Sequence, residues 1–310
     1  MKRISTYIPS IILSVLLVFC LIGSAAALIA DIDLTAEKTI SLTDKESVDE
    51  RALASLERYY REKAGSTGIP STVYTDNITI GYVREVMEVY IRETFSALEH
   101  NGEFAPEVPK NPELESAIEK FFNDYADETG YEKDEKFEKK LESTINNAYR
   151  NIGDSCDIFK VNSMNSHGLL KKVSRLYSKR WLFTWLTCGA AAFVVLLFLL
   201  LHRKRKCEVL YWGGVSALIA GITGFVPCLW LISKKYYDSF TIKQPQVFRA
   251  YTKSLYKLTE IFMAVSIAIA VIGLCMITVY IVIGREKTVS AASAPVSSGE
   301  NNSSEILTKD

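Results

Sequence analysis

The chain has 310 residues, with 36 basic and 36 acidic side chains, so its formal net charge is zero. This balance hides a division: residues 31–159 carry 29 Asp/Glu and 15 Lys/Arg, a net of −14, and all other residues carry 21 basic and 7 acidic side chains, a net of +14. Such a separation argues against a uniformly solvated chain and indicates that the basic part lies near a membrane. Of six cysteines only Cys156 falls in the acidic region, which excludes a disulfide within it, and the lack of CxxC pairs disfavours zinc.

Four uncharged apolar segments are long enough to cross a bilayer, since about 20 residues at 1.5 Å each span roughly 30 Å. The first lies in residues 1–30, a signal-anchor or first transmembrane helix, and the others are 181–201, 209–232 and 261–283. Small residues at Ser24–Ala27 offer a signal-peptidase site, so the first segment is either cleaved, leaving three spans, or retained. Its apolar length favours retention.

Residues 31–160 have the patterns of a small, acidic, helical domain. A capping box at Thr43–Glu46 predicts one helix start, and Asp76 or Asn77 predicts a second. Asn111 followed by Pro112 predicts the start of a third, and a fourth is expected from about Lys133. Apolar residues recur at helical spacing in each segment. The predicted fold is therefore all-α: a polytopic membrane protein with four transmembrane helices and an extracytoplasmic helical bundle. An exported domain without disulfides favours a bacterial origin.

Two basic segments flank the spans. Residues 161–180 are expected to form an amphipathic juxtamembrane helix at the bilayer surface, and 233–260 an extracytoplasmic loop rich in basic and aromatic residues. An interfacial position explains that composition better than nucleic-acid binding does, so the expected partners are the lipid bilayer and a membrane or envelope protein. An equal alternative is that these basic residues offset the negative charge of the acidic domain itself. The residues predicted to make these contacts are Lys171, Lys172, Arg175, Lys179, Arg180, Lys234 and Lys235.

A seam of small residues, Gly213, Ala217 and Gly221, recurs every four positions in the third apolar segment. Small residues at this spacing let another helix approach closely, which would also permit a homo-oligomer. The tail, residues 284–310, is rich in Ser, Ala and Asn, and is expected to be disordered and cytoplasmic.

The orientation follows from conflicting signals. With the N-terminus inside, eight basic residues near the spans are cytoplasmic, whereas the opposite orientation places eleven inside. The N-terminal export pattern and the dense cluster at 203–206 nevertheless favour cytoplasmic termini in a cell membrane, with residues 31–180 extracytoplasmic.

The sequence contains few residues in patterns typical of ion transport, catalysis or metal binding. No charged residue falls inside a predicted span, which disfavours a proton- or ion-coupled transporter. The three histidines are far apart, the acidic run 124–135 lacks the spacing of a calcium loop, and Cys156 has acidic neighbours that disfavour a reactive thiolate. We therefore predict no catalytic, cofactor-binding or metal-binding residue.

The layout, a large external domain after the first span and a smaller loop later, resembles that of the permease-like FtsX proteins of bacterial cell division. The resemblance is one of layout, without a shared residue motif, and it implies a membrane subunit of an ATPase-driven permease or export complex. The turn 202–208 is short for docking an ATPase. We expect instead an interaction module, a scaffold or sensor, whose external domain binds a protein or envelope component. An envelope enzyme is the third hypothesis.

Overall fold

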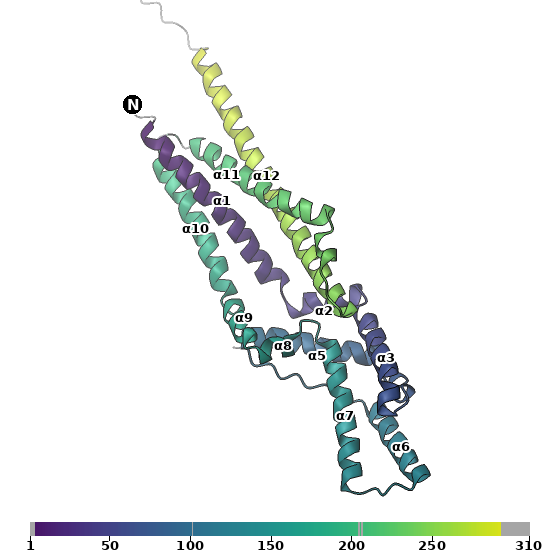
Figure 1. Ribbon diagram of the computed structural model, residues 1–310. Helices are drawn as coiled ribbons and strands as arrows, with labels where there is room; N and C mark the ends of the chain where they lie inside the picture. Colours follow the sequence, from purple (N-terminus) through teal and green to yellow (C-terminus); the bar gives the residue numbers. More distant parts are fainter. Residues whose placement is uncertain (1–3, 101, 204, 206, 293–310) are drawn as a thin grey trace, which may run out of the picture.

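The computed structural model describes residues 4–100, 102–203, 205 and 207–292, and all regular secondary structure in these residues is helical. This confirms the all-α prediction for the described part of the chain. Four helices in this part of the chain are long and apolar enough to cross a membrane, and the helical domain lies between the first and second of them in the sequence. Figure 1 shows these long helices at one end and the helical domain at the other. The long helices are α1 (Ile4–Asp33), α10 (Arg180–Leu201), α11 (Cys207–Ser233) and α12 (Pro245–Ala292).

All four long helices are long and apolar enough to cross a membrane, as predicted, with mean hydropathies of 2.1 to 2.8 over their most apolar stretches. Helix α1 packs along α10, and α11 packs along α12; a contact between α1 and α11 joins the two pairs. In that contact the hydroxyls of Ser14 and Ser216 lie 2.5 Å apart. The start of α1, the α10–α11 turn and the far end of α12 lie at one end, opposite the helical domain (Figure 1).

The helical domain contains more elements than the four predicted helices. The differences come from capping: Thr43 lies inside a helix that Thr35 caps, so the predicted capping box is wrong, and the second predicted helix begins later, at a cap formed by Thr79. The predicted cap at Asn111 with Pro112 in the first turn is confirmed, because the Asn111 side chain accepts the Leu114 N–H at 3.0 Å. The elements are α2 (Ala36–Lys45), α3 (Val48–Thr67), α4 (Thr72–Thr75), α5 (Ile80–Glu99), α6 (Pro112–Thr129), α7 (Glu135–Cys156), α8 (Val161–Ser166) and α9 (Leu169–Tyr177).

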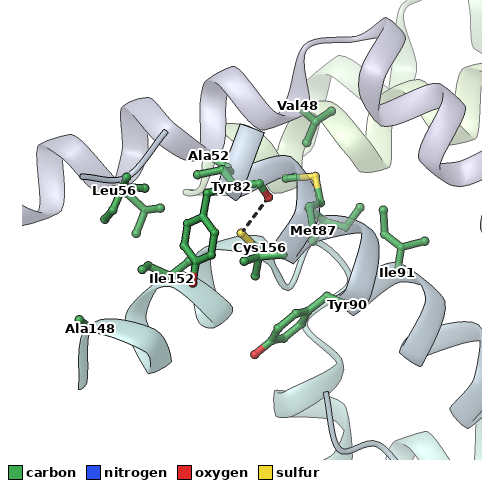
Figure 2. Packing of buried hydrophobic residues seen from close by; sticks show 14 of the residues in the cluster. Val48, Ala52, Leu56, Tyr82, Met87, Tyr90, Ile91, Ala148, Ile152 and Cys156 are labelled. Atoms are coloured by element: carbon green, nitrogen blue, oxygen red, sulfur yellow. Dashed lines mark hydrogen bonds between the residues drawn. The ribbon is translucent and has the colours of Figure 1, made fainter. Parts of the chain in front are cut away.

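The core of this domain lies between α3, α5 and α7 (Figure 2). Val48, Ile91 and Ile152 are fully buried there, and each such side chain stabilises the fold by about 1.5–3 kcal/mol relative to its exposed state. Cys156 is buried among them, with its Sγ 3.7 Å from the Val83 carbonyl oxygen. Burial raises the pKa of the Cys156 thiol to about 12, so the thiol is protonated at neutral pH.

The segments expected as a loop and a tail are partly helical. Helix α11 ends at Ser233, a short 3-10 turn spans Tyr236–Ser239, and α12 already begins at Pro245. More than half of the predicted loop 233–260 therefore belongs to the helix that becomes the last span. At the other end, α12 continues to Ala292, and residues 293–310 of the predicted tail lie outside the described residues. The predicted juxtamembrane helix 161–180 is divided into α8, α9 and the start of α10.

Candidate functional site at the domain–membrane junction

The first turns of α12 dock onto the helical domain before the helix enters its apolar stretch. Gln246 is 1% exposed, and its side-chain nitrogen donates to the Ser155 carbonyl at 3.4 Å and contacts the Ser155 hydroxyl at 3.3 Å. Val247 and Ala250 are buried on the same side of the helix, and the Tyr251 hydroxyl donates to the Phe159 carbonyl at 3.3 Å. This end of α12 is therefore part of the domain's packing.

Glu46, in the helical domain, forms ion pairs with two basic residues of the docked part of α12. It is the C-cap residue of α2, its side chain is 16% exposed, and one of its carboxylate oxygens lies 2.8 Å from an Arg249 guanidinium nitrogen. The Lys253 ammonium group lies 3.6 Å from the same carboxylate oxygen. Because the carboxylate is shielded from solvent, the pair is worth more than an exposed ion pair, whose median contribution is about 0–1 kcal/mol. Arg249 and Lys253 lie in the segment predicted to be a loop facing the lipid headgroups, and in the structure they contact the helical domain instead.

Arg180 forms a second connection, at the base of α10. Its guanidinium lies 3.3 Å from Asp31 at the end of α1, 2.8 Å from Glu99 at the end of α5, and 4.1 Å above the Tyr177 ring. The Tyr177 hydroxyl donates to the Leu34 carbonyl at 2.7 Å. Burial raises the pKa of Tyr177, and the Arg180 charge opposes that shift. Arg180, predicted to contact lipid or a partner, is thus engaged within the chain.

The other residues predicted to contact lipid or a partner lie in two parts of the structure, at α9 and at the end of α11. Helix α9 turns Leu170 and Ser174 inward, where the Ser174 hydroxyl donates to the Leu98 carbonyl at 3.0 Å. Its outer face exposes an apolar stripe beside exposed basic residues, an arrangement suited to a bilayer surface. Lys234 and Lys235 are exposed at the end of α11, away from α9 in the chain. The stripe is Leu169, Val173 and Leu176, and the basic residues beside it are Lys171, Lys172, Arg175 and Lys179.

The predicted small-residue seam packs against α12 of the same chain. A Cβ added to Gly221 would lie 2.6 Å from the Ala270 Cβ, and Ala217 is buried in the same contact, whereas Gly213 faces only the end of the Met276 side chain. Gly273 on α12 also belongs to this contact and was not predicted from the sequence: an added Cβ there would lie 2.5 Å from the Leu218 nitrogen. The seam was predicted from small residues that recur every four positions within α11, and such a pattern in one helix carries no information about which residue of another helix it contacts.

A groove of about 470 Å³ opens between α3, α4 and α7, on the part of the domain remote from the long helices. Among the described residues no acidic side chain lines it, although the domain as a whole is acidic. The Tyr60 and Tyr74 rings stack there with centroids 4.1 Å apart. The polar and aromatic side chains that line it are Tyr59, Tyr60, Lys63, Ser66, Thr67, Tyr74, Lys140, Thr144, Asn147 and Asn151.

The sequence did not indicate this groove, because its residues come from three separate helices and form no local motif. Within the described part of the chain, no group of three or more His, Cys, Asp or Glu side chains is placed to hold a metal ion. Comparisons with protein families, with curated proteins and with solved structures found no match.

Proposed function

We propose that this chain is a membrane-anchored interaction protein, a scaffold or sensor, whose helical domain is extracytoplasmic and binds a protein or envelope component. The observation that carries the proposal is the continuity of α12. One helix begins at Pro245, is buried against the domain at Gln246, Val247 and Ala250, and continues through an apolar stretch that can cross the membrane. A rigid helix shared by two parts of a protein transmits a displacement of one part to the other.

The groove at the remote part of the domain is the surface that we assign to recognition. Tyr59 is the exposed tyrosine of the groove, beside the stacked and buried Tyr60 and Tyr74. Its edge, with the amides and hydroxyls around it, can form directional contacts at modest entropic cost, and Tyr is enriched at binding hot spots. Lys63 and Lys140 give the groove a local positive charge within an acidic domain. The ligand is therefore expected to present acidic groups to the groove while the rest of the domain repels acidic competitors.

The experiment compares matched variants of the full-length protein in native membranes. Tyr59→Ala with Lys140→Gln changes the groove, and Lys139→Gln removes a charge one position away, from an exposed ion pair with Glu135. We expect a protein or envelope component to co-purify with the wild type and with Lys139→Gln, but not with the groove variant. Equal recovery with all three proteins, or recovery with none, contradicts the proposal.

A second readout separates this function from the permease subunit implied by the chain's layout. An interaction protein should retain its partner without nucleotide hydrolysis. A stable complex with an ATPase, whose activity depends on this chain, would instead assign it to an ATPase-driven complex.

A further inference from the structure

A pocket of about 620 Å³ lies at the end of the long helices opposite the helical domain. It is formed by the start of α1, the α10–α11 turn, the first turns of α11 and the last part of α12. This places it where the apolar stretches end, at the depth of lipid headgroups. None of its residues takes part in the junction or the groove described above.

Buried polar groups form the floor of the pocket. His202 is 5% exposed, with Nε2 3.3 Å from the Ser10 hydroxyl and 3.4 Å from a Glu208 carboxylate oxygen, and its Nδ1 lies 3.2 Å from the Phe198 carbonyl. Ser10 is fully buried and donates to the Thr6 carbonyl at 2.8 Å. Polar groups at a membrane boundary are costly unless partnered, and here both side chains have partners.

This geometry does not support hydrolysis by a serine, a histidine and an acid. In such a site one imidazole nitrogen contacts the serine and the other contacts the carboxylate. Here Ser10 and Glu208 both approach the same nitrogen of His202, and the other nitrogen faces a main-chain carbonyl. The cluster therefore fixes the α10–α11 turn against α1, and what remains open to a ligand is the mouth above it.

The mouth of the pocket combines cations with aromatic walls. Arg203 and Arg205 are exposed there, and Arg205 uses one guanidinium nitrogen on Glu208 at 3.1 Å, which orients the side chain and leaves further donors. The Tyr7 and Trp212 rings meet edge to face at 5.6 Å. Guanidinium groups bind phosphate oxygens bidentately, and Trp and Tyr belong at the headgroup level of a membrane.

We infer that this pocket binds an anionic phospholipid. The phosphate lies at Arg203 and Arg205, and the start of the acyl chains lies on the wall formed by Tyr7 and Trp212. A zwitterionic phosphocholine headgroup would bring a quaternary ammonium toward two guanidinium groups and is disfavoured. Inorganic phosphate would gain the cationic contacts without the apolar wall. This inference is independent of the proposed function of the helical domain.

The test uses the full-length protein in mixed detergent micelles with phosphatidylglycerol and phosphatidylcholine of identical acyl chains, and bound lipid is counted by native mass spectrometry. We expect the wild type to retain phosphatidylglycerol over phosphatidylcholine by roughly tenfold or more, because two guanidinium groups face the anionic headgroup. Arg203→Gln with Arg205→Gln should abolish the preference. Lys133→Gln with Lys139→Gln, which removes two exposed charges from the helical domain, should preserve it.

Tyr7→Ala keeps both cations and removes a side chain that is 58% exposed, so insertion and folding should be unaffected, while lipid occupancy falls several-fold. A millimolar concentration of inorganic phosphate should not displace the lipid. Equal retention of the two lipids by the wild type, an equal loss with the two double variants, or displacement by inorganic phosphate would overturn the assignment.

Discussion

Replacing Glu46 by Gln should loosen the docked end of α12 while leaving the helix in place. The carboxylate is 16% exposed and contacts Arg249, which is 35% exposed, at 2.8 Å. Removing one partner of a buried ion pair costs about 3–5 kcal/mol, and an exposed ion pair contributes about 0.2–1 kcal/mol. Partial burial places this pair near about 1.5 kcal/mol, equivalent to roughly a tenfold change in the opening equilibrium.

Hydrogen exchange in lipid nanodiscs measures that equilibrium directly. Amides from Val247 to Thr252 should exchange roughly tenfold faster in Glu46→Gln, with no change in the apolar part of α12. A double-mutant cycle with Arg249→Gln should return a coupling free energy of about 1.5 kcal/mol, whereas the same cycle on the exposed pair Glu135–Lys139 should return less than about 0.5 kcal/mol. Additive effects of Glu46→Gln and Arg249→Gln would refute the reasoning.

Three further predictions concern packing and protonation. Gly221→Ile should separate α11 from α12 and lower the temperature of aggregation in detergent, whereas Gly189→Ile, at a position with no atom within 4 Å of an added Cβ, should be tolerated. Ile152→Ala should destabilise the helical domain by about 2–5 kcal/mol, measured by pulse proteolysis in urea, because it empties a fully buried position. Burial raises the pKa of the Cys156 thiol from 9.0 to about 12, so the stability that this group contributes is present below pH 9.0 and is lost as the pH rises toward 12. Cys156→Ala should therefore flatten the dependence of unfolding free energy on pH in that range. Iodoacetamide should label Cys156 at pH 8 only after the domain unfolds.

The spans and the four longest helices of the domain could be predicted because their signals are local. Apolar length identifies a membrane helix, and Asn111 with Pro112 marks a helix start through a contact that spans three residues. The helix start predicted from the capping box at Thr43–Glu46 was wrong because a local pattern can be satisfied in more than one way. Thr43 can satisfy a backbone group in the turn before it, and its hydroxyl donates to the Ile40 carbonyl at 2.7 Å, so its presence did not require a new helix.

The junction could not be predicted because its interactions are distant in the sequence. Arg249 and Lys253 have the composition of an interfacial loop, and only the folded chain brings Glu46, some 200 residues earlier, against them. Arg180 likewise joins side chains from α1 and α5. The sequence shows which basic residues need an anionic partner. Whether that partner is a lipid headgroup or a carboxylate of the same chain depends on the tertiary structure.

The measurement that tests the central claim most directly is a nitroxide scan along residues 245–265 of the full-length protein in nanodiscs. A continuous helix docked on the domain predicts a mobility pattern with a period of 3.6 residues through the whole stretch. Labels at the buried positions Val247, Ala250 and Thr259 should be immobile, and a label at the exposed Glu260 should be mobile. Uniformly high mobility without a period over residues 245–257 would show a loop at this point and would contradict the coupling of domain and membrane through α12.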